Sequence, residues 1–321
     1  MFSAPPIHRL ALGTRASALA LAQSSRVARA VEAAAERTGT YVDVELVHVT
    51  TKGDVDRSPL VSLGGSGVFV ARLREALLAG ECDFAVHSCK DLPSGDQEGL
   101  VIAALPRRAD PRDVLCSRLG PLNDLPRGAR VGTGSPRRAA SILALRPDLE
   151  VVDIRGNVTT RLRRIEDDLD AVVLAAAGLI RLDLAHCITE YLEPVRVLPP
   201  AAQGALAIET RADADPRLID LLASLDDPAT RLAVTAERSL MNALGAGCAA
   251  PVGAFAHLEG ETLLLEGAVL STDGARSLRL MASVPASGGL AAATGLGEHL
   301  AAALVDAGAG DIADLGASHR S

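Results

Sequence analysis

Arginine is concentrated in residues 154–164 (IRGNVTTRLRR), where four of eleven residues are arginines although the formal net charge of the chain is −8. The composition offers an ordinary explanation. Only two of the 32 basic residues are lysines, Lys52 and Lys90, and such a chain places arginines close together by chance. A functional cluster differs from a chance one by where its arginines lie in the secondary structure, so the predicted helix starts decide between the two.

The segment 131–145 (VGTGSPRRAASILAL) predicts a helix with arginines in its first turn. Ser135 is a favourable N-cap and Pro136 suits the first helical position, which places Arg137 and Arg138 just inside the helix. Cations in a first turn oppose the helix dipole at a cost of about 0.3–1 kcal/mol each. Two other predicted helix starts also have arginines where the helix dipole disfavours positive charge. Arg155 and Arg161 lie on either side of the expected cap Asn157, and Arg15 precedes the expected cap Ser17.

These helix starts predict a site for a ligand with several negative groups. They follow predicted strands, and open α/β sheets bind ligands at the carboxyl ends of their strands. The N–H groups at a helix N-terminus attract anions, and arginine pairs bidentately with carboxylate or phosphate. One arginine at a helix start carries little weight, whereas three helix starts with the same departure favour a functional explanation over chance.

Two further positions have residue types suited to chemistry, Lys90–Asp91 and Cys248. Lys90 and Asp91 follow a predicted strand over 82–88, and an aspartate among cations keeps its charge and can exchange protons. An exposed ion pair in an ordinary turn would give the same residues. Cys248 lies in a loop of small residues (GAGCAAPVGAFA), where a nucleophilic sulfur would be reachable. A buried structural cysteine is the common alternative, and no activating histidine is nearby in the sequence.

Alternating strand and helix patterns predict an α/β fold for the first part of the chain. Residues 41–49 (YVDVELVHV) alternate apolar and charged side chains as a half-buried strand does, whereas Phe69, Leu73 and Leu77 recur at helical spacing. Such alternation indicates βαβ units and a mainly parallel sheet.

Two proline-containing segments divide the chain, one around Pro106 and Pro111 and one over 195–211. Beyond about residue 228, a helix, an antiparallel meander and a closing helix indicate a different kind of domain. We therefore expect three domains: an α/β domain over 7–106 with 204–223, an α/β domain over 112–199, and an α+β domain over 228–316.

The composition argues against several classes of protein. No run of about 18 apolar residues indicates a membrane span, and the first residues lack the pattern of a signal peptide. A pI near 5.4 and an aromatic content of 2% argue against a nucleic-acid partner. Five cysteines without a C-x-x-C pair fit a reducing compartment and indicate no metal site. We therefore expect a cytoplasmic protein.

Seven segments occur in the order and spacing of a known family. They are GTRASALALAQ, GGSGVFVARLREALLAGECDFAVHSCKDLP, VGTGSPRRAA, IRGNVTTRLRRI, AAAGLIRL, LPPAAQGALAIETR and GCAAPVGAFA. Through them nearly the whole chain resembles the porphobilinogen deaminases, also called hydroxymethylbilane synthases. The resemblance implies two periplasmic-binding-protein-like α/β domains around a cleft, with a smaller C-terminal α+β domain.

The resemblance also implies a function, a transferase of tetrapyrrole and haem biosynthesis. It would deaminate four porphobilinogen molecules and join them head to tail, releasing hydroxymethylbilane and ammonia. Each porphobilinogen carries an acetate and a propionate, which would explain the arginines. Cys248 would carry a dipyrromethane primer through a thioether. Asp91 would be the catalytic carboxylate that assists loss of the amino group, and the protein would be a monomer.

The resemblance assigns the remaining site residues to two groups. Those that would hold the acidic side chains of the primer are Lys90, Thr133, Ser135, Arg137 and Arg138. Those that would contact the substrate are Arg15, Ser17, Phe69, Arg155, Arg161 and Arg181. The chain departs from the family pattern at Ser62 and Ser66, where many relatives carry lysines, so a lid formed by that loop would carry less charge. GTGS and AAQGA also replace commoner sequences.

Two other functions compete with this one. An anion-binding protein on the same bilobed fold, without catalysis, would explain the arginines. It would not need Lys90–Asp91, Cys248 or a third domain. An enzyme that acts on phosphate esters is the other alternative, and the absence of a G-x-x-x-x-G-K-[ST] loop argues against a nucleotide-dependent one.

Overall fold

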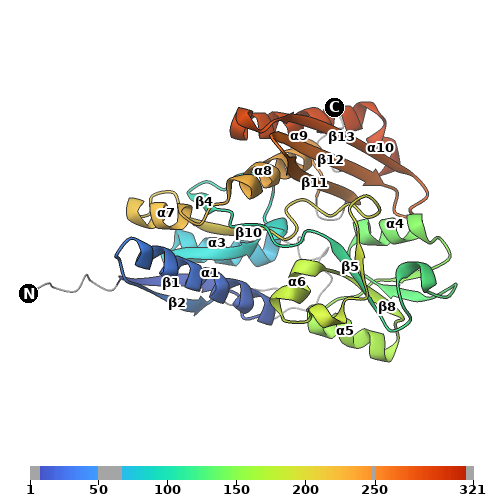
Figure 1. Cartoon of the computed structure of the whole chain (residues 1–321), viewed down its shortest axis with the longest axis horizontal. Helices are drawn as coiled ribbons and strands as arrows, with labels where there is room; N and C mark the ends of the chain where they lie inside the picture. Colours follow the sequence, from blue (N-terminus) through green and yellow to red (C-terminus); the bar gives the residue numbers. More distant parts are fainter. Residues whose placement is uncertain (1–7, 50–66, 248–249, 316–321) are drawn as a thin grey trace, which may run out of the picture. The chain divides into compact units, whose positions relative to one another are not determined.

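The computed structural model describes residues 8–49, 67–247 and 250–315, and the chain forms two compact units (Figure 1). Unit 1 comprises Met1–Arg108 and Ala205–Pro228, and unit 2 comprises Ala109–Gly204 and Ala229–Ser321. The chain therefore leaves unit 1, returns to it and ends in unit 2.

Unit 1 is built on a five-stranded sheet with strand order β2-β1-β3-β10-β4. β1 (His8–Thr14) pairs in parallel with β2 (Val42–His48) and β3 (Phe84–Ser88). β10 (Leu206–Arg211) runs antiparallel to β3 and to β4 (Leu100–Ala104). The mainly parallel sheet expected from the sequence is confirmed, and its antiparallel strand β10 comes from the segment in which the chain re-enters unit 1.

Helices pack on both faces of this sheet because side chains along a strand alternate between the faces. Phe84 and Val86 of β3 join a core with residues of α1 (Ala18–Arg37) and α7 (Pro216–Ala223). Ala85 joins the opposite core with Leu73 and Leu77 of α3 (Gly67–Leu78). The same alternation assigns His87 to the α3 face and Ser88 to the α1 face.

Unit 2 contains a second five-stranded sheet, with order β7-β6-β8-β5-β9. β6 (Arg130–Gly132) is parallel to β7 (Glu150–Val152) and β8 (Ala171–Ala175), and β5 (Asp113–Ser117) is antiparallel to β8 and β9 (Glu190–Leu192). The two sheets therefore share a design in which the antiparallel strand is contributed where the chain crosses from the other unit.

Alternation again decides which side chains meet which helix in unit 2. Leu115 of β5 packs in a core with Ile142 of α4 (Pro136–Leu145), whereas Val114 packs with residues of α5 (Val158–Asp167) and α6 (Ala176–Arg181). Asp113, two residues before Leu115, is thereby directed to the α4 face.

The last part of unit 2 is an antiparallel meander packed against helices. β11 (Val252–Glu259), β12 (Thr262–Leu270) and β13 (Ser277–Pro285) pair in sequence order. Leu240 of α8 (Pro228–Ala243), Leu265 of β12 and Leu300 of α9 (Gly289–Asp306) share its core. α10 (Ala309–Ile312) follows α9, and short 3₁₀ turns lie at Cys89–Asp91, Leu122–Asp124, Ala185–Cys187 and Ala286–Gly288.

The predicted fold class, two α/β parts and a smaller α+β part, is confirmed. Within the described ranges, no helix combines the length and the apolar character that crossing a bilayer requires.

The packing of α9 against α8 predicts opposite effects for two glycines on one helix. A Cβ at Gly297 would lie 2.5 Å from the Ala236 carbonyl oxygen and 2.6 Å from the Leu240 nitrogen, whereas a Cβ at Gly295 would have nothing within 4 Å. We expect Gly297→Ala to lower the free energy of unfolding by about 1–3 kcal/mol, because the helices must separate. Gly295→Ala should raise it by about 0.5–1 kcal/mol, because alanine favours the helix. Urea unfolding of both variants measures this, and equal effects would contradict the packing.

Candidate functional site

The start of α4 is capped as the sequence predicts, but its arginines point into the protein. Ser135 Oγ accepts a hydrogen bond from the Arg138 backbone N–H at 3.4 Å, and Pro136 occupies the first helical position. The exposed fractions of Arg137 and Arg138 are 3% and 6%. They are therefore not residues of a solvated helix face, and the chance explanation fails for these two.

One buried carboxylate holds both of these arginines. Asp113 is fully buried, and its Oδ2 accepts a hydrogen bond from Arg137 at 2.6 Å while its Oδ1 accepts one from Arg138 Nε at 2.9 Å. Burial alone would raise the pKa of Asp113, but the charges of Arg137 and Arg138 outweigh it and hold that pKa below its ordinary value. Two cations thus share one anion in the interior.

Neutral oxygens accept some of the other hydrogen bonds that Arg137 and Arg138 donate. Arg137 donates to the Leu198 carbonyl oxygen at 2.7 Å, and Arg138 donates to Gln203 Oε1 at 3.3 Å. Gln203 Nε2 in turn donates to Asp113 Oδ1 at 2.9 Å. The Arg137 Nε–H is buried and has no acceptor within the part of the chain that the structure describes. An unsatisfied charged donor of this kind favours a ligand oxygen.

A second group of arginines lies around the start of α5. Asn157 Oδ1 accepts a hydrogen bond from the Thr160 N–H at 2.8 Å, so the expected cap is confirmed. Arg161 Nε donates to the Gly156 carbonyl oxygen at 2.8 Å. Burial and then the charges of Arg138 and Arg155 lower the pKa of Arg161, with Asp153 as a partial offset. Arg138 and Arg155 are therefore close enough to Arg161 to repel it, although Arg155 itself pairs with Asp153 at 3.2 Å.

The other predicted residues of unit 2 are also placed by local hydrogen bonds. Thr133 is 3% exposed, and its Oγ1 accepts a hydrogen bond from the Ser135 N–H at 3.2 Å. Arg181, the last residue of α6, donates to the Gly204 carbonyl oxygen at 2.6 Å.

In unit 1, Lys90 and Asp91 lie in the turn Cys89–Asp91 that directly follows β3. The Cys89 N–H donates to the Ala205 carbonyl oxygen at 3.0 Å, and Cys89 and Leu92 are buried. Lys90 and Asp91 between them are half-buried. The turn is therefore anchored from both sides while the aspartate keeps access to solvent.

The start of α1 is the third predicted helix start. Ser17 Oγ accepts a hydrogen bond from the Ala20 N–H at 3.3 Å, which confirms the cap, and Arg15 is half-buried between β1 and α1. Gln23 of α1 donates to Ser88 Oγ at 2.9 Å, which ties the helix to the end of β3.

Some predicted residues lie outside the described part of the structure. Cys248, Ser62 and Ser66 belong to undescribed ranges, and Phe69 lies in α3 but its side chain is not described. Cys82 and Cys116 are buried in the core, and burial raises the pKa of their thiols to about 11 and about 12. Cys187 is half-buried and packs against the core of unit 2.

Sequence reasoning missed the partners that hold the arginines. Asp113 could have been found, because an aspartate at the start of an apolar strand (DVLC) needs a buried counter-ion. Gln203 had only a weak signal, since a buried glutamine in a loop resembles any other polar loop residue. The fold and these arginines are suited to a ligand that carries several carboxylates.

Comparison with known proteins identifies the family. Residues 10–219 match the family model described as "Porphobilinogen deaminase, dipyromethane cofactor binding domain", and residues 231–306 match that of the porphobilinogen deaminase C-terminal domain. The porphobilinogen deaminase of Cutibacterium acnes is 51% identical, over 96% of this chain and 97% of that protein. Porphobilinogen deaminase 1 of Streptomyces coelicolor is 52% identical, over 94% of this chain and 97% of that protein. The chain belongs to the porphobilinogen deaminase family of transferases, whose cofactor is dipyrromethane.

The described residues fit that cofactor. A dipyrromethane assembled from porphobilinogen carries acetate and propionate groups, which match guanidinium donors in geometry and charge. The buried Arg137 Nε–H offers such a group an otherwise unused donor. The repulsion of Arg161 by Arg138 and Arg155 would be relieved by the same carboxylates.

The shared carboxylate of Asp113 predicts a pH-dependent loss of stability. Its folded-state pKa lies below the value of about 3.9 expected in the unfolded chain. Its contribution is therefore complete above about pH 5 and is lost as the pH falls through the folded-state pKa. We expect Asp113→Asn to lower the free energy of unfolding by about 3–5 kcal/mol at pH 6, because two buried cations lose their anion. The difference from the wild type should shrink toward pH 3.

Urea unfolding of both proteins between pH 6 and pH 3 measures this dependence. Asp148→Asn is a control, because Asp148 pairs with Arg146 in the same unit at 2.7 Å while both side chains are partly exposed to solvent. Its effect should be much smaller. A difference between wild type and Asp113→Asn that does not change with pH would contradict the assignment.

Proposed function

We propose that Asp91 is the acid–base residue that deaminates porphobilinogen and joins four molecules of it head to tail, yielding hydroxymethylbilane and ammonia. The role of Asp91 is supported by its half-buried place in the turn that directly follows β3, and the class of ligand by the arginines, because the charges of Arg138 and Arg155 lower the pKa of Arg161. Arg138 pairs with Asp113 and the exposed Arg155 pairs with Asp153, but Arg137, Arg138, Arg155 and Arg161 together outnumber these two carboxylates. A ligand that gains an acetate and a propionate with each condensation supplies further counter-charge.

The roles of the remaining residues follow the same division as the family motifs. We assign the cofactor to Cys248 as its attachment point, with its acidic groups held by Lys90, Thr133, Ser135, Arg137 and Arg138. We assign the carboxylates and the ring of the incoming substrate to Arg15, Ser17, Phe69, Arg155, Arg161 and Arg181. The bound dipyrromethane supplies the pyrrole carbon to which the first substrate is joined.

The proposed chemistry requires one carboxyl group to act in two directions. The C–N bond of the substrate aminomethyl group breaks, and Asp91 supplies the proton with which the nitrogen leaves as ammonia. Its carboxylate then stabilises the positive charge left on the substrate. When the new C–C bond has formed, a proton leaves the pyrrole carbon and Asp91 accepts it. The half-buried position of Asp91 suits this exchange.

We further propose that the chain acts as a cytoplasmic monomer of three domains, over 7–106 with 204–223, 112–199 and 228–316, with neither nucleic acid nor membrane as a partner. The acidic pI of 5.4 supports the absence of a nucleic-acid partner. Cys82, Cys89, Cys116 and Cys187 form no disulfide, which supports a reducing compartment.

The proposed function predicts that the cofactor is covalently attached at Cys248. The intact mass of the purified wild type should exceed the sequence mass by two linked pyrrole units, and Cys248→Ser should lack this excess. If the wild type is purified without the excess, incubation with porphobilinogen should add pyrrole units stepwise. A wild-type mass that stays unchanged after this incubation would contradict the proposed function and leave an anion-binding protein without catalysis.

A comparison of two arginines distinguishes a specific contact with the substrate from a general effect of surface charge. Arg161 and Arg163 lie on the same helix, but Arg161 is crowded by Arg138 and Arg155, whereas Arg163 is exposed. We expect Arg161→Gln to raise KM for porphobilinogen about 10- to 100-fold, because a charge-assisted hydrogen bond contributes about 1.5–3 kcal/mol. Arg163→Gln should leave KM unchanged. Steady-state kinetics of both variants tests this, and equal effects would overturn the assigned role of Arg161.

A further inference from the structure

A buried cluster of ionisable side chains lies on the α3 face of the unit 1 sheet, and none of its members is assigned a role above. Arg74, His87 and Glu209 are 8%, 5% and 1% exposed. Arg74 Nε donates to both Glu209 oxygens at 3.1 Å, and its NH2 group donates to Oε1 at 2.8 Å. His87 Nε2 lies 3.2 Å from Glu209 Oε2, a close contact without the geometry of a hydrogen bond.

Stability alone is a weak reason for such a cluster. Removing charges from water is costly, and apolar residues of the same volume often stabilise an interior equally well or better. What the cluster provides is a specific geometry, because a bidentate arginine–carboxylate pair fixes both distance and orientation. The three residues come from three elements, α3, β3 and β10, so the cluster fixes these elements relative to one another.

These elements are the ones that lead to the proposed site residues in unit 1. His87 is the residue before the end of β3, and the turn with Lys90 and Asp91 follows Ser88 directly. Glu209 lies on β10, which pairs with β3 and begins just after Ala205, the residue whose carbonyl oxygen accepts the Cys89 N–H. Arg74 lies five residues after Phe69 on α3.

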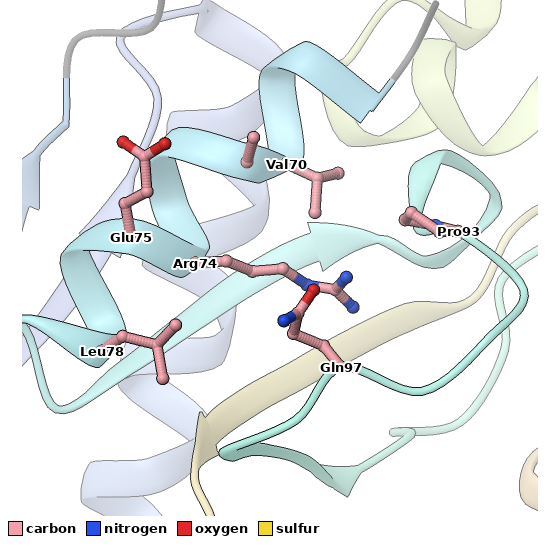
Figure 2. Close-up of a pocket in the computed structure, with 7 residues that line it drawn as sticks. Val70, Arg74, Glu75, Leu78, Pro93 and Gln97 are labelled. Carbon is pink, nitrogen blue, oxygen red and sulfur yellow. The ribbon is translucent and has the colours of Figure 1, made fainter.

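The outer side of the cluster is open. Arg74 lines a pocket of about 300 Å³ together with Glu75, Leu78 and Gln97, and Figure 2 shows the guanidinium group of Arg74 beside the carboxamide of Gln97. The pocket also includes Pro93, two residues after Asp91. If the Arg74 side chain were truncated, this pocket would extend to Glu209, and a small cation could enter it from solvent.

We infer that Arg74, His87 and Glu209 are positioning residues that hold the Asp91 turn against α3, so that the carboxyl group of Asp91 meets the leaving amino group. The inference rests on the proposed role of Asp91. According to this inference, changes in the cluster lower the rate of the chemical step and therefore kcat. Substrate affinity depends instead on the arginines assigned above.

Glu209→Gln tests this inference with little change in volume. We expect the variant to fold and carry its covalent cofactor, as seen by circular dichroism and intact mass. Its kcat should fall about 10- to 100-fold, because a displacement of about 1 Å can cost that much, while KM for porphobilinogen changes less than about threefold. Asp83→Asn is the matched control. Asp83 lies just before the opposite end of β3, where its carboxylate accepts the Ala11 N–H at 2.7 Å, and its loss should leave kcat unchanged.

Arg74→Ala gives a second test, which can be carried out even if Glu209→Gln folds poorly. We expect its kcat to fall similarly and to recover at least fivefold with millimolar methylguanidinium, which fits the enlarged pocket and pairs with Glu209. Tetramethylammonium, which cannot donate hydrogen bonds, should not restore kcat. Recovery with both cations, or with neither, would overturn the inference.

Asp91→Asn separates the failure of this inference from that of the proposed function. If Asp91→Asn retains turnover, the proposed role of Asp91 fails and the inference fails with it. If Asp91→Asn is inactive but folded Glu209→Gln keeps the wild-type kcat, only the positioning role is overturned. A loss of kcat in Asp83→Asn equal to that in Glu209→Gln would also overturn it, because the effect would then be one of general stability.

Discussion

The arrangement of unit 2 depends on one carboxylate, that of Asp113, shared by two buried arginines. Arg137 and Arg138 lie in the first turn of α4, where the helix dipole already disfavours positive charge, and both are buried. Removing them from water would be prohibitive without Asp113, which contacts both at 2.6–2.9 Å. Because one anion serves two cations, the pair keeps a net positive charge inside the protein. That residual charge is what a carboxylate ligand can use.

The buried network around Asp113 continues into the last part of the chain. Gln203 binds Asp113 and follows Ala202, whose φ of 59° is uncommon for a residue with a side chain. The fully buried Glu237 of α8 accepts the Ala202 N–H at 2.6 Å and the Ala256 N–H of β11 at 2.7 Å. Polar contacts therefore connect the helix that precedes Cys248 with the arginines of α4. A buried polar network of this kind, in which Arg137 Nε–H is the donor left without an acceptor in the described residues, specifies one arrangement more strictly than apolar packing does.

Side chains along a strand alternate between the two faces of a sheet, and this explains why each unit has a buried ionisable side chain on one particular face. In β5 the alternation directs Asp113 to the α4 face, and in β3 it directs His87 to the α3 face. Val114 of β5 and Val86 of β3, each one position away, fill apolar cores on the opposite faces. In each unit a strand thus delivers one ionisable side chain under a helix while its other residues supply the core. The turn that contains Asp91 also follows β3 directly, so no loop separates the core of unit 1 from the proposed site.

The sequence by itself determined the helix starts, the alternation of strands and helices, the meander and the family. These depend on local rules: Ser17, Ser135 and Asn157 are caps because their side chains satisfy backbone N–H groups within three residues. It could also identify Arg137, Arg161 and Asp91 as candidates, since residue type and position in an element suffice for that. Only the tertiary structure decided that Arg137 and Arg138 are buried on Asp113, and that Glu209 joins Arg74, 135 positions earlier, to His87. Such partners are fixed by which strands become neighbours in a sheet, and strand order depends on packing across the whole chain rather than on any local pattern.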